Sequence, residues 1–259
     1  MSYNKQVQCY YCNKVGHEYA NCFSKQLINQ DFECTLSNEM WKLYKKLLPT
    51  SIDEEKRKNF VKKIEGILNH EWPNFEIKVN MFGSSVNLLG TSTSDVDICV
   101  TTSSKELENM LTLSEKLQKH KMEVVKCVSN AKVPIVKFLD PTLKLACDIN
   151  VNNAQALHNT NLIKSYVCLD SKVRLLVMII KHWAWRRDLN DATCGTLSSY
   201  TWTCMVLNFL QMCYPPILLV LKISEKELLE VEYKNNDSSG GLLLINNESI
   251  GGLLFAFFK

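Results

Sequence analysis

The segment at residues 81–102, MFGSSVNLLGTSTSDVDICVTT, restricts the possible folds of this chain more than any other. It reads as a glycine–serine turn, a short connection, and then a strand that carries Asp95 and Asp97. Side chains two residues apart on a strand point to the same face, so these two carboxylates project together. The apolar residues available for the opposite, buried face are Val96, Ile98 and Val100.

Two carboxylates held this close repel each other unless a cation lies between them. Hard oxygen ligands favour Mg²⁺, which usually reaches a protein together with the phosphates of a substrate. Upstream, Gly83 and Ser84 offer a backbone that a phosphate can approach closely and a hydroxyl donor. Alone, a Gly-Ser pair is usually a loop and Asp-Val-Asp a solvated strand end, but their ordered combination indicates nucleotidyl transfer.

Length and composition leave the class of protein open. A chain of 259 residues holds one large domain or two modest ones, and 46% hydrophobic with 22% charged residues is ordinary for a globular protein. The net charge of +3 permits a nucleic-acid partner without arguing for one.

No apolar run reaches the ~18 residues of a membrane span. The N-terminus shows no charged and apolar leader. We therefore expect no membrane and a reducing compartment, the cytoplasm or alternatively the nucleus.

Near the N-terminus, Cys9, Cys12, His17 and Cys22 follow the spacing C-x₂-C-x₄-H-x₄-C. Three thiolates and one imidazole complete a tetrahedral Zn²⁺ site with no open position, which indicates a structural role. A segment this short cannot build a core, so the metal would supply its folding energy. The spacing is that of a retroviral-type zinc knuckle, a module that binds single-stranded RNA. A protein-binding knuckle is the alternative.

Between Ser37 and Asn69, apolar residues recur at helical spacing, and Pro49 divides the segment into two helices. Ser51 or Asp53 is the expected cap of the second helix. A basic series follows on this helix, and we interpret it as a solvated face in preference to an RNA-backbone surface. Its members are Lys56, Arg57, Lys58, Lys62 and Lys63.

Farther along the chain, the pattern predicts a third carboxylate on a strand. Residues 75–82 alternate like a strand, and residues 104–119 form an amphipathic helix that Ser103 or Ser104 caps. Three more strand-like runs follow, at residues 122–128, 133–139 and 143–151. The last contains Asp148 among β-favouring residues, where an unpaired charge is costly. A metal shared with Asp95 and Asp97 would offset that cost, whereas alone Asp148 reads as a solvent-facing strand end.

These motifs resemble the DNA polymerase β-like nucleotidyltransferases. Within them, the chain is similar to the terminal uridylyltransferases and cytoplasmic poly(A) polymerases, over residues 37–259. The segments that carry this narrower resemblance, in order, are NAKVPIVK (130–137), CDINVNN (147–153), LHNT (157–160), KHWA (181–184) and GTLSSY (195–200). A zinc knuckle also accompanies the catalytic module in the uridylyltransferase branch.

The resemblance implies roles for individual residues. Asp95, Asp97 and Asp148 would hold two Mg²⁺ (or Mn²⁺) ions, and Asp148 would help to activate an RNA 3′-hydroxyl. The implied nucleotide contacts are Gly83 and Ser84 to the β- and γ-phosphates, Asn153 and Thr160 to ribose and base, Lys181 to the triphosphate, Ser199 to phosphate, and Tyr200 stacked under the base.

Three positions depart from the family pattern. Relatives carry a second lysine where this chain has Trp185, followed by Arg186 and Arg187. They tend to place a glycine where this chain has Leu88. Residues 249–258 resemble the start of the poly(A)-polymerase-associated segment, which in relatives continues into a base-reading loop. The resemblance therefore implies that the sequence is truncated after Lys259.

Together these arguments predict an α+β fold in two lobes behind a small zinc knuckle. The expected domains are 1–30 for the knuckle and linker, 66–161 for the catalytic domain, and 35–65 with 162–259 for the helical domain. The expected function is template-independent addition of uridylate from UTP to RNA 3′ ends by a monomer. Two alternatives remain: a poly(A) polymerase that uses ATP, and an RNA-binding protein whose transferase is impaired.

Overall fold

The computed structural model describes residues 29–221 and 246–259. The expected zinc ligands Cys9, Cys12, His17 and Cys22 lie outside the described residues. The chain divides into two compact units, one of Leu47–Val167 and one that joins Met1–Lys46 to Cys168–Lys259. Each unit is described by itself.

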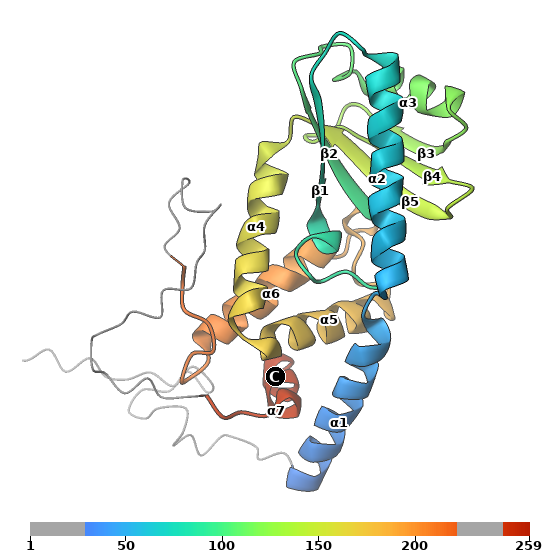
Figure 1. Ribbon diagram of the computed structural model, residues 1–259. Coiled ribbons are helices and arrows are strands. Elements are labelled where there is room, and N and C mark those ends of the chain that lie inside the picture. The colour runs from blue at the N-terminus through green and yellow to red at the C-terminus, as the bar shows by residue number, and fades with distance from the viewer. Residues whose placement is uncertain (1–28, 222–245) are drawn as a thin grey trace, which may run out of the picture. The chain divides into compact units, whose positions relative to one another are not determined.

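A five-stranded mixed sheet forms the centre of the first unit, in the order β1-β2-β5-β4-β3. β2 and β5 run parallel, and every other neighbouring pair is antiparallel. The strands are β1 (Ile77–Phe82), β2 (Val96–Thr102), β3 (Glu123–Val128), β4 (Ile135–Asp140) and β5 (Leu145–Val151). With its helices this sheet confirms the α+β class predicted from the sequence (Figure 1).

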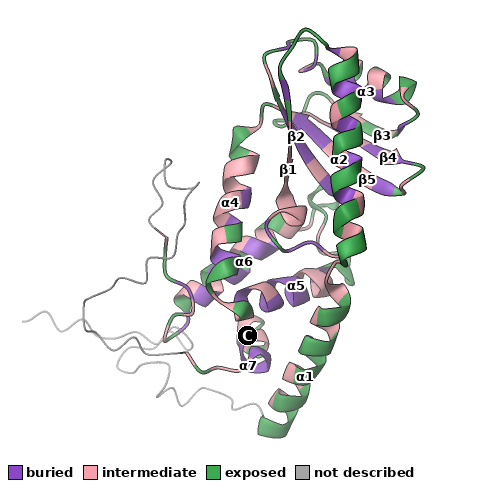
Figure 2. Ribbon diagram, viewed as in Figure 1, coloured by how far each residue is buried: buried purple, intermediate pink, exposed green. Residues whose placement is uncertain are grey.

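Two helices, α2 (Ser51–Glu71) and α3 (Met110–Lys119), supply the apolar side chains that cover one face of the sheet. The contact between α2 and β4 includes Phe60 and Phe138, whose ring centroids lie 6.1 Å apart. The outer side of α2 is exposed, whereas buried residues concentrate in the strands (Figure 2). On β2 the residues in this core are Val96, Ile98 and Val100. This is the alternation that the sequence predicts for the buried face.

The structure groups α2 differently from our expectation, which placed residues 35–65 in the helical lobe. Phe60 and Ile64 of α2 are fully buried in the core of the sheet, so α2 belongs to the sheet unit. Its cap also differs, because Thr50 is the N-cap and accepts from the Asp53 amide in a capping box. The cap of α3 is Asn109, not Ser103 or Ser104, because residues 105–108 form a turn before the helix begins.

The second unit is helical. Its helices are α1 (Gln30–Leu47, which ends at the unit boundary), α5 (Ser171–Trp185), α6 (Ser199–Met212) and α7 (Ile250–Phe257). Asp170 caps α5, since its carboxylate accepts from the Lys172 amide at 2.7 Å. α7 approaches α1 so closely that a Cβ on Gly251 would lie 2.7 Å from the Glu33 carbonyl oxygen.

α4 (Ala154–Leu169) follows β5, and nearly all of it belongs to the sheet unit. Within the described ranges, none of the helices combines the length and apolarity that crossing a membrane requires.

Candidate active site

Asp97 and Asp148 lie opposite each other on neighbouring parallel strands, where they are register partners of β2 and β5. Their neighbours in sequence, Val96, Ile98, Cys147 and Ile149, are all in the buried core. Because strand side chains alternate, both carboxylates point to the face of the sheet opposite α2 and α3. Asp95 lies two residues before Asp97, directly ahead of β2. The structure thus brings together two strands that are about fifty residues apart in the sequence.

The charges of these three aspartates act on one another. Partial burial raises the pKa of the Asp95 carboxyl, the charge of Asp148 raises it further, and Lys137 opposes both. Behind them, burial raises the pKa of the Cys147 thiol, and all three aspartates add to that effect. Three carboxylates with one lysine among them leave an excess of negative charge, which a cation would relieve.

Lys137 on β4 is a site residue that our sequence reasoning did not assign. It is the register partner of Asp148 in the antiparallel β4–β5 pair, and its ammonium donates to Asp148 Oδ2. The sequence signal that could have identified Lys137 is the hairpin formed by the two strands. Folding the chain at the Asp140–Pro141 turn that separates two predicted strands places residues 137 and 148 opposite each other.

Gly83 is required where it stands. Its φ of +65° is left-handed, and a Cβ there would lie 2.3 Å from Asp97 Oδ2. Any side chain would therefore strike the carboxylate. The Gly83 amide donates to Thr160 Oγ1 at 2.9 Å, and Ser84 follows in the short 3₁₀ turn Gly83–Ser85. The structure thus joins the predicted phosphate turn to Asp97 and to Thr160 on α4.

Leu88 occupies the position at which relatives tend to have glycine. Its φ is +67°, in the left-handed region that favours glycine, and its exposed fraction is 37%. The chain therefore keeps the left-handed turn without the residue that adopts it most easily. Such a conformation costs about 1–2 kcal/mol for an L-residue.

Asn153 stands at the start of α4, two residues beyond β5. Its side-chain carbonyl accepts from the Ala156 amide at 3.2 Å, and its backbone carbonyl accepts from the Cys99 thiol at 3.6 Å. The position of Asn153 is thus fixed by its own local hydrogen bonds at the end of the strand that carries Asp148.

The three remaining predicted site residues, Lys181, Ser199 and Tyr200, belong to the helical unit. Lys181 lies on α5, and Ser199 and Tyr200 form the first turn of α6, which Ser198 caps. Tyr200 is half exposed, and burial followed by its neighbour Cys204 raises the pKa of its hydroxyl.

Near the end of α5, two arginines lie against tryptophan rings. The Arg187 guanidinium lies 4.6 Å from the ring centroid of Trp183, and that of Arg186 lies 6.0 Å from the ring centroid of Trp185. Trp185, at the position of the expected second lysine, is 57% exposed. Cation–π contacts of this kind hold arginines beside aromatic rings.

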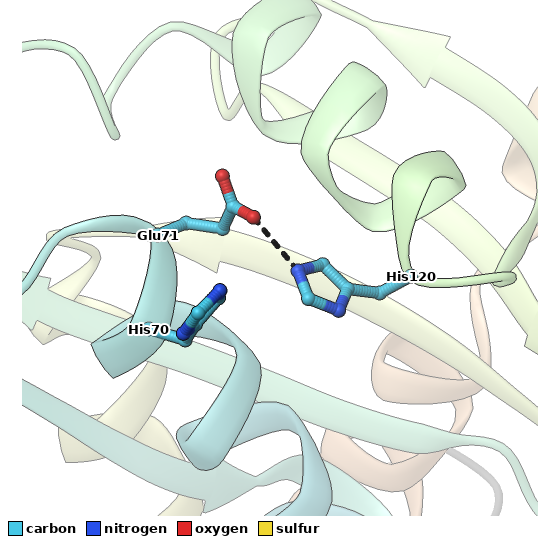
Figure 3. Close-up of side chains that lie close together, drawn as sticks. All are labelled: His70, Glu71 and His120. Carbon is cyan, nitrogen blue, oxygen red and sulfur yellow. Dashed lines mark hydrogen bonds and ion pairs between the residues drawn. The ribbon is translucent and has the colours of Figure 1, made fainter.

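A different cluster has the tightest metal-like geometry among the described residues. The ligand atoms of His70, Glu71 and His120 all lie within 4.8 Å of one another (Figure 3). However, Glu71 already accepts from Lys116, Lys119 and His120, each at 2.8 Å. Two ammonium groups on the same carboxylate oppose a divalent cation, so we interpret this cluster as an ion-pair connection between α2 and α3.

The three aspartates suit a hard cation better, although their oxygens are more widely spread than those of the Glu71 cluster. Their donor set consists of carboxylate oxygens alone, which are the ligands that Mg²⁺ and Mn²⁺ prefer. Burial and the charge of Asp148 raise the pKa of Asp95 although Lys137 opposes them, so a cation at this carboxylate would be favourable. The absence of a side chain on Gly83 lets the Asp97 carboxylate lie against the backbone of the turn.

A mixed sheet that presents acidic residues from neighbouring strands beside a glycine–serine turn defines a nucleotidyltransferase palm. The chain belongs to the family described as "Poly(A) RNA polymerase, mitochondrial-like, central palm domain", whose family model matches residues 36–168.

Relatives and a solved structure agree with this assignment. Poly(A) RNA polymerase cid11 of Schizosaccharomyces pombe is 39% identical over 240 residues, which cover 89% of this chain and 49% of the relative. Human terminal uridylyltransferase 7 is 34% identical over 233 residues, covering 83% of this chain and 16% of that protein. The solved structure of the Cid1 poly(U) polymerase with Mg 3′-dATP bound has a TM-score of 0.69 and 27% identity. That match covers 88% of this chain and 72% of the Cid1 chain. The present chain therefore spans half or less of the length of the first two relatives.

Proposed function

We propose that this protein is a template-independent RNA 3′-terminal nucleotidyltransferase that adds uridylate from UTP. The observation that carries the proposal is the parallel register of Asp97 and Asp148, which places both carboxylates on one face with Asp95 beside them. Both human terminal uridylyltransferase 7 and the Cid1 poly(U) polymerase are named for the same class of reaction.

In the proposed reaction, the RNA 3′-oxygen forms a bond to the α-phosphorus of UTP, and the bond from that phosphorus to the bridging oxygen breaks. Pyrophosphate leaves with that oxygen, and the proton of the attacking hydroxyl passes to water. Mg²⁺ or Mn²⁺ supplies Lewis-acid activation and charge neutralisation when bound. Asp95, Asp97 and Asp148 would hold the ions, and Asp148 would orient the attacking hydroxyl.

The remaining assigned residues would position the nucleotide. The turn at Gly83 and Ser84 suits the β- and γ-phosphates, because Gly83 adds no side chain there and Ser84 offers a hydroxyl donor. Lys181 and Ser199 suit the triphosphate as a point charge and a hydroxyl donor. Tyr200 offers an aromatic face on which a base can stack.

Thr160 on α4 lies beside the Gly83 turn, and Asn153 directly precedes the same helix. Thr160 accepts from the Gly83 amide, so a nucleotide that contacts Gly83 would also lie near Thr160. We propose that these two residues contact ribose and base.

The use of ATP is the first alternative. It is favoured by the name of cid11, a poly(A) RNA polymerase, which has a higher identity to this chain than human terminal uridylyltransferase 7. A protein that binds RNA but does not extend it is the second alternative. Trp185 in place of a phosphate-binding lysine is the observation that favours it.

We also propose a Zn²⁺-bound knuckle formed by Cys9, Cys12, His17 and Cys22, which would bind single-stranded RNA. We further propose that the protein is a monomer in the cytoplasm. Metal analysis of the purified chain, with Cys12→Ser as the comparison, tests the knuckle independently of catalysis.

Incubation of the full chain with a labelled RNA primer and each nucleoside triphosphate in turn tests the function. We expect a ladder of extended products with UTP, in the presence of Mg²⁺ or Mn²⁺. A ladder with ATP alone would replace the proposal by its first alternative. Binding of the primer without extension by any nucleotide would leave the RNA-binding alternative.

A further inference from the structure

A groove beside the aspartates is lined by three positively charged side chains to which the family resemblance assigns no role. It encloses a volume of about 300 Å³ and lies entirely within the sheet unit. Its lining includes Lys56 and Arg57 of α2, Lys144 and Ala146 near the start of β5, and the loop Ser92–Asp95.

The groove is continuous with the candidate active site. Leu139 and Ala146, which line it, are register partners on β4 and β5. Ala146 is two residues before Asp148 on the same strand and therefore on the same face. Two residues along a strand correspond to about 7 Å, so the groove begins one short step from the Asp148 carboxylate.

Arg57 gives the groove a positive charge that no carboxylate neutralises directly. It is only 5% exposed, and its Nη2 donates to the carbonyls of Thr91, Ser92 and Ser94 at 2.6, 3.2 and 3.1 Å. Its buried Nε has no hydrogen-bond partner. Between residues 29 and 221 and in 246–259, no carboxylate forms an ion pair with Arg57. Asp53 is near enough to feel its charge, but the Asp53 carboxylate accepts from the amide and hydroxyl of Thr50.

Lys56 and Lys144 at the groove differ from Lys63, which lies farther along α2, in their ion pairing. Lys63 pairs with the buried Asp140 carboxylate at 2.7 Å. Lys56 and Lys144 have no such ion-pair partner among the residues that the structure describes. Two carboxylates, Asp53 and Asp95, also line the groove, so its three cationic groups exceed its carboxylates by one. A buried guanidinium and two lysine ammonium groups without carboxylate partners in the described ranges can attract an anion there.

We propose that this groove binds backbone phosphates of the RNA strand whose 3′ end reaches the aspartates. The inference rests on the proposed function, because it takes RNA as the substrate, and it assigns Lys56, Lys144 and Arg57 as positioning residues for that substrate. Lys56 and Lys144 would contact the phosphates, and Arg57 would hold the loop Thr91–Ser94 in place and add its charge.

The test replaces the two lysines while keeping the local backbone. Lys56→Gln keeps a good helix former on α2. Lys144 has a φ of +52°, and asparagine tolerates that left-handed conformation, so the second change is Lys144→Asn. The control is the double variant Lys58→Gln/Lys62→Gln, which removes two exposed lysines from the same helix. The full chain is used throughout.

The first measurement is the affinity for a labelled single-stranded RNA at several salt concentrations, without nucleotide or divalent cation. For Lys56→Gln/Lys144→Asn we expect about tenfold weaker binding, and a slope of log affinity against log salt that is smaller by about 1.4. The control pair should bind like the wild type. An equal loss in both pairs, or no loss in either, overturns the proposal. Because this measurement needs no catalysis, its outcome is separate from that of the proposed function.

The second measurement distinguishes an RNA phosphate from free pyrophosphate. With a long primer, the groove variant should have a higher KM for RNA and an unchanged KM for UTP. With a dinucleotide primer, which is too short to reach along the groove, the difference from the wild type should disappear. Weaker inhibition by pyrophosphate with an unchanged KM for RNA would overturn the proposal by assigning the groove to the product.

Discussion

Two charged clusters in the sheet unit show opposite electrostatic states. At the junction of α2 and α3, one carboxylate, Glu71, accepts from two lysines and His120, which lower its pKa. At β2 and β5, three carboxylates lie together, and the pKa of Asp95 is raised by burial and by Asp148. The lowered pKa of Glu71 reflects one carboxylate that two lysines already neutralise, whereas at Asp95 burial and the charge of Asp148 outweigh the single opposing lysine, Lys137.

The comparison explains why the cluster with the tighter metal-like geometry is not the better metal site. His70, Glu71 and His120 meet a distance criterion, but the lysines that hold Glu71 would repel the ion. The aspartates are less tightly grouped, yet their chemistry suits Mg²⁺. Charge balance therefore distinguishes a structural cluster from a functional one where distance alone does not.

The largest expected effect is the loss of activity when an aspartate becomes neutral. Asp97→Asn should lower the rate of primer extension by about a thousandfold, because it removes charge at the point where the ions would bind. Its thermal midpoint should stay the same or rise, since like-charge repulsion falls. Glu71→Gln should show the opposite pattern, with the rate of extension kept and the thermal midpoint lowered. Extension rates and melting curves of the two variants measure this contrast. If Glu71→Gln lost activity as severely while still folded, the contrast between the clusters would be wrong.

The next largest effect is expected for Arg57→Met, which should lower the stability of the fold. The substitution removes the donor for three carbonyls of the loop 91–94 and leaves them without their charged partner. We expect the free energy of unfolding to fall by about 3 kcal/mol, measured by denaturant titration. Lys58→Met, an exposed position one residue away, is the matched control and should change stability little. Equal values for the two variants would show that the loop does not depend on Arg57.

The Glu71 cluster should produce a smaller and pH-dependent effect. Its lysine and histidine hydrogen bonds lower the pKa of Glu71 from its usual 4.5. A carboxyl group whose pKa is lowered by folding adds stability above its unfolded pKa and loses that contribution as the pH falls through the folded pKa. The thermal midpoints of wild type and Glu71→Gln should therefore differ at neutral pH and converge in acid. A constant difference across that range would mean that the charge of Glu71 is not what stabilises the junction.

Much of the sheet was predictable because its signals are local. The alternation of Val96, Ile98 and Val100 identified the buried face, and the i, i+2 spacing placed Asp95 and Asp97 together on the other. The assignment of Asp148 to the same face needed the family resemblance as well, because a strand position alone does not say which strand pairs with it.

What the sequence did not reveal depends on contacts between distant residues. Arg57 read as part of a solvated basic face, but its partners are carbonyls 34 to 37 residues away, and no local pattern indicates that. Lys137 read as a strand residue until the hairpin register placed it against Asp148. The N-cap of α3 was misplaced because Ser104 and Asn109 are both good caps, and only packing decides between them.

The central claim is that Asp95, Asp97 and Asp148 converge on shared divalent ions. Titration of Mn²⁺ with UTP into the full chain, followed by calorimetry, tests it most directly when wild type is compared with Asp148→Asn and Glu71→Gln. We predict that Asp148→Asn, whose carboxylate lies on the second strand, weakens Mn²⁺ binding strongly, whereas Glu71→Gln leaves it unchanged. Equal binding by wild type and Asp148→Asn would contradict the account.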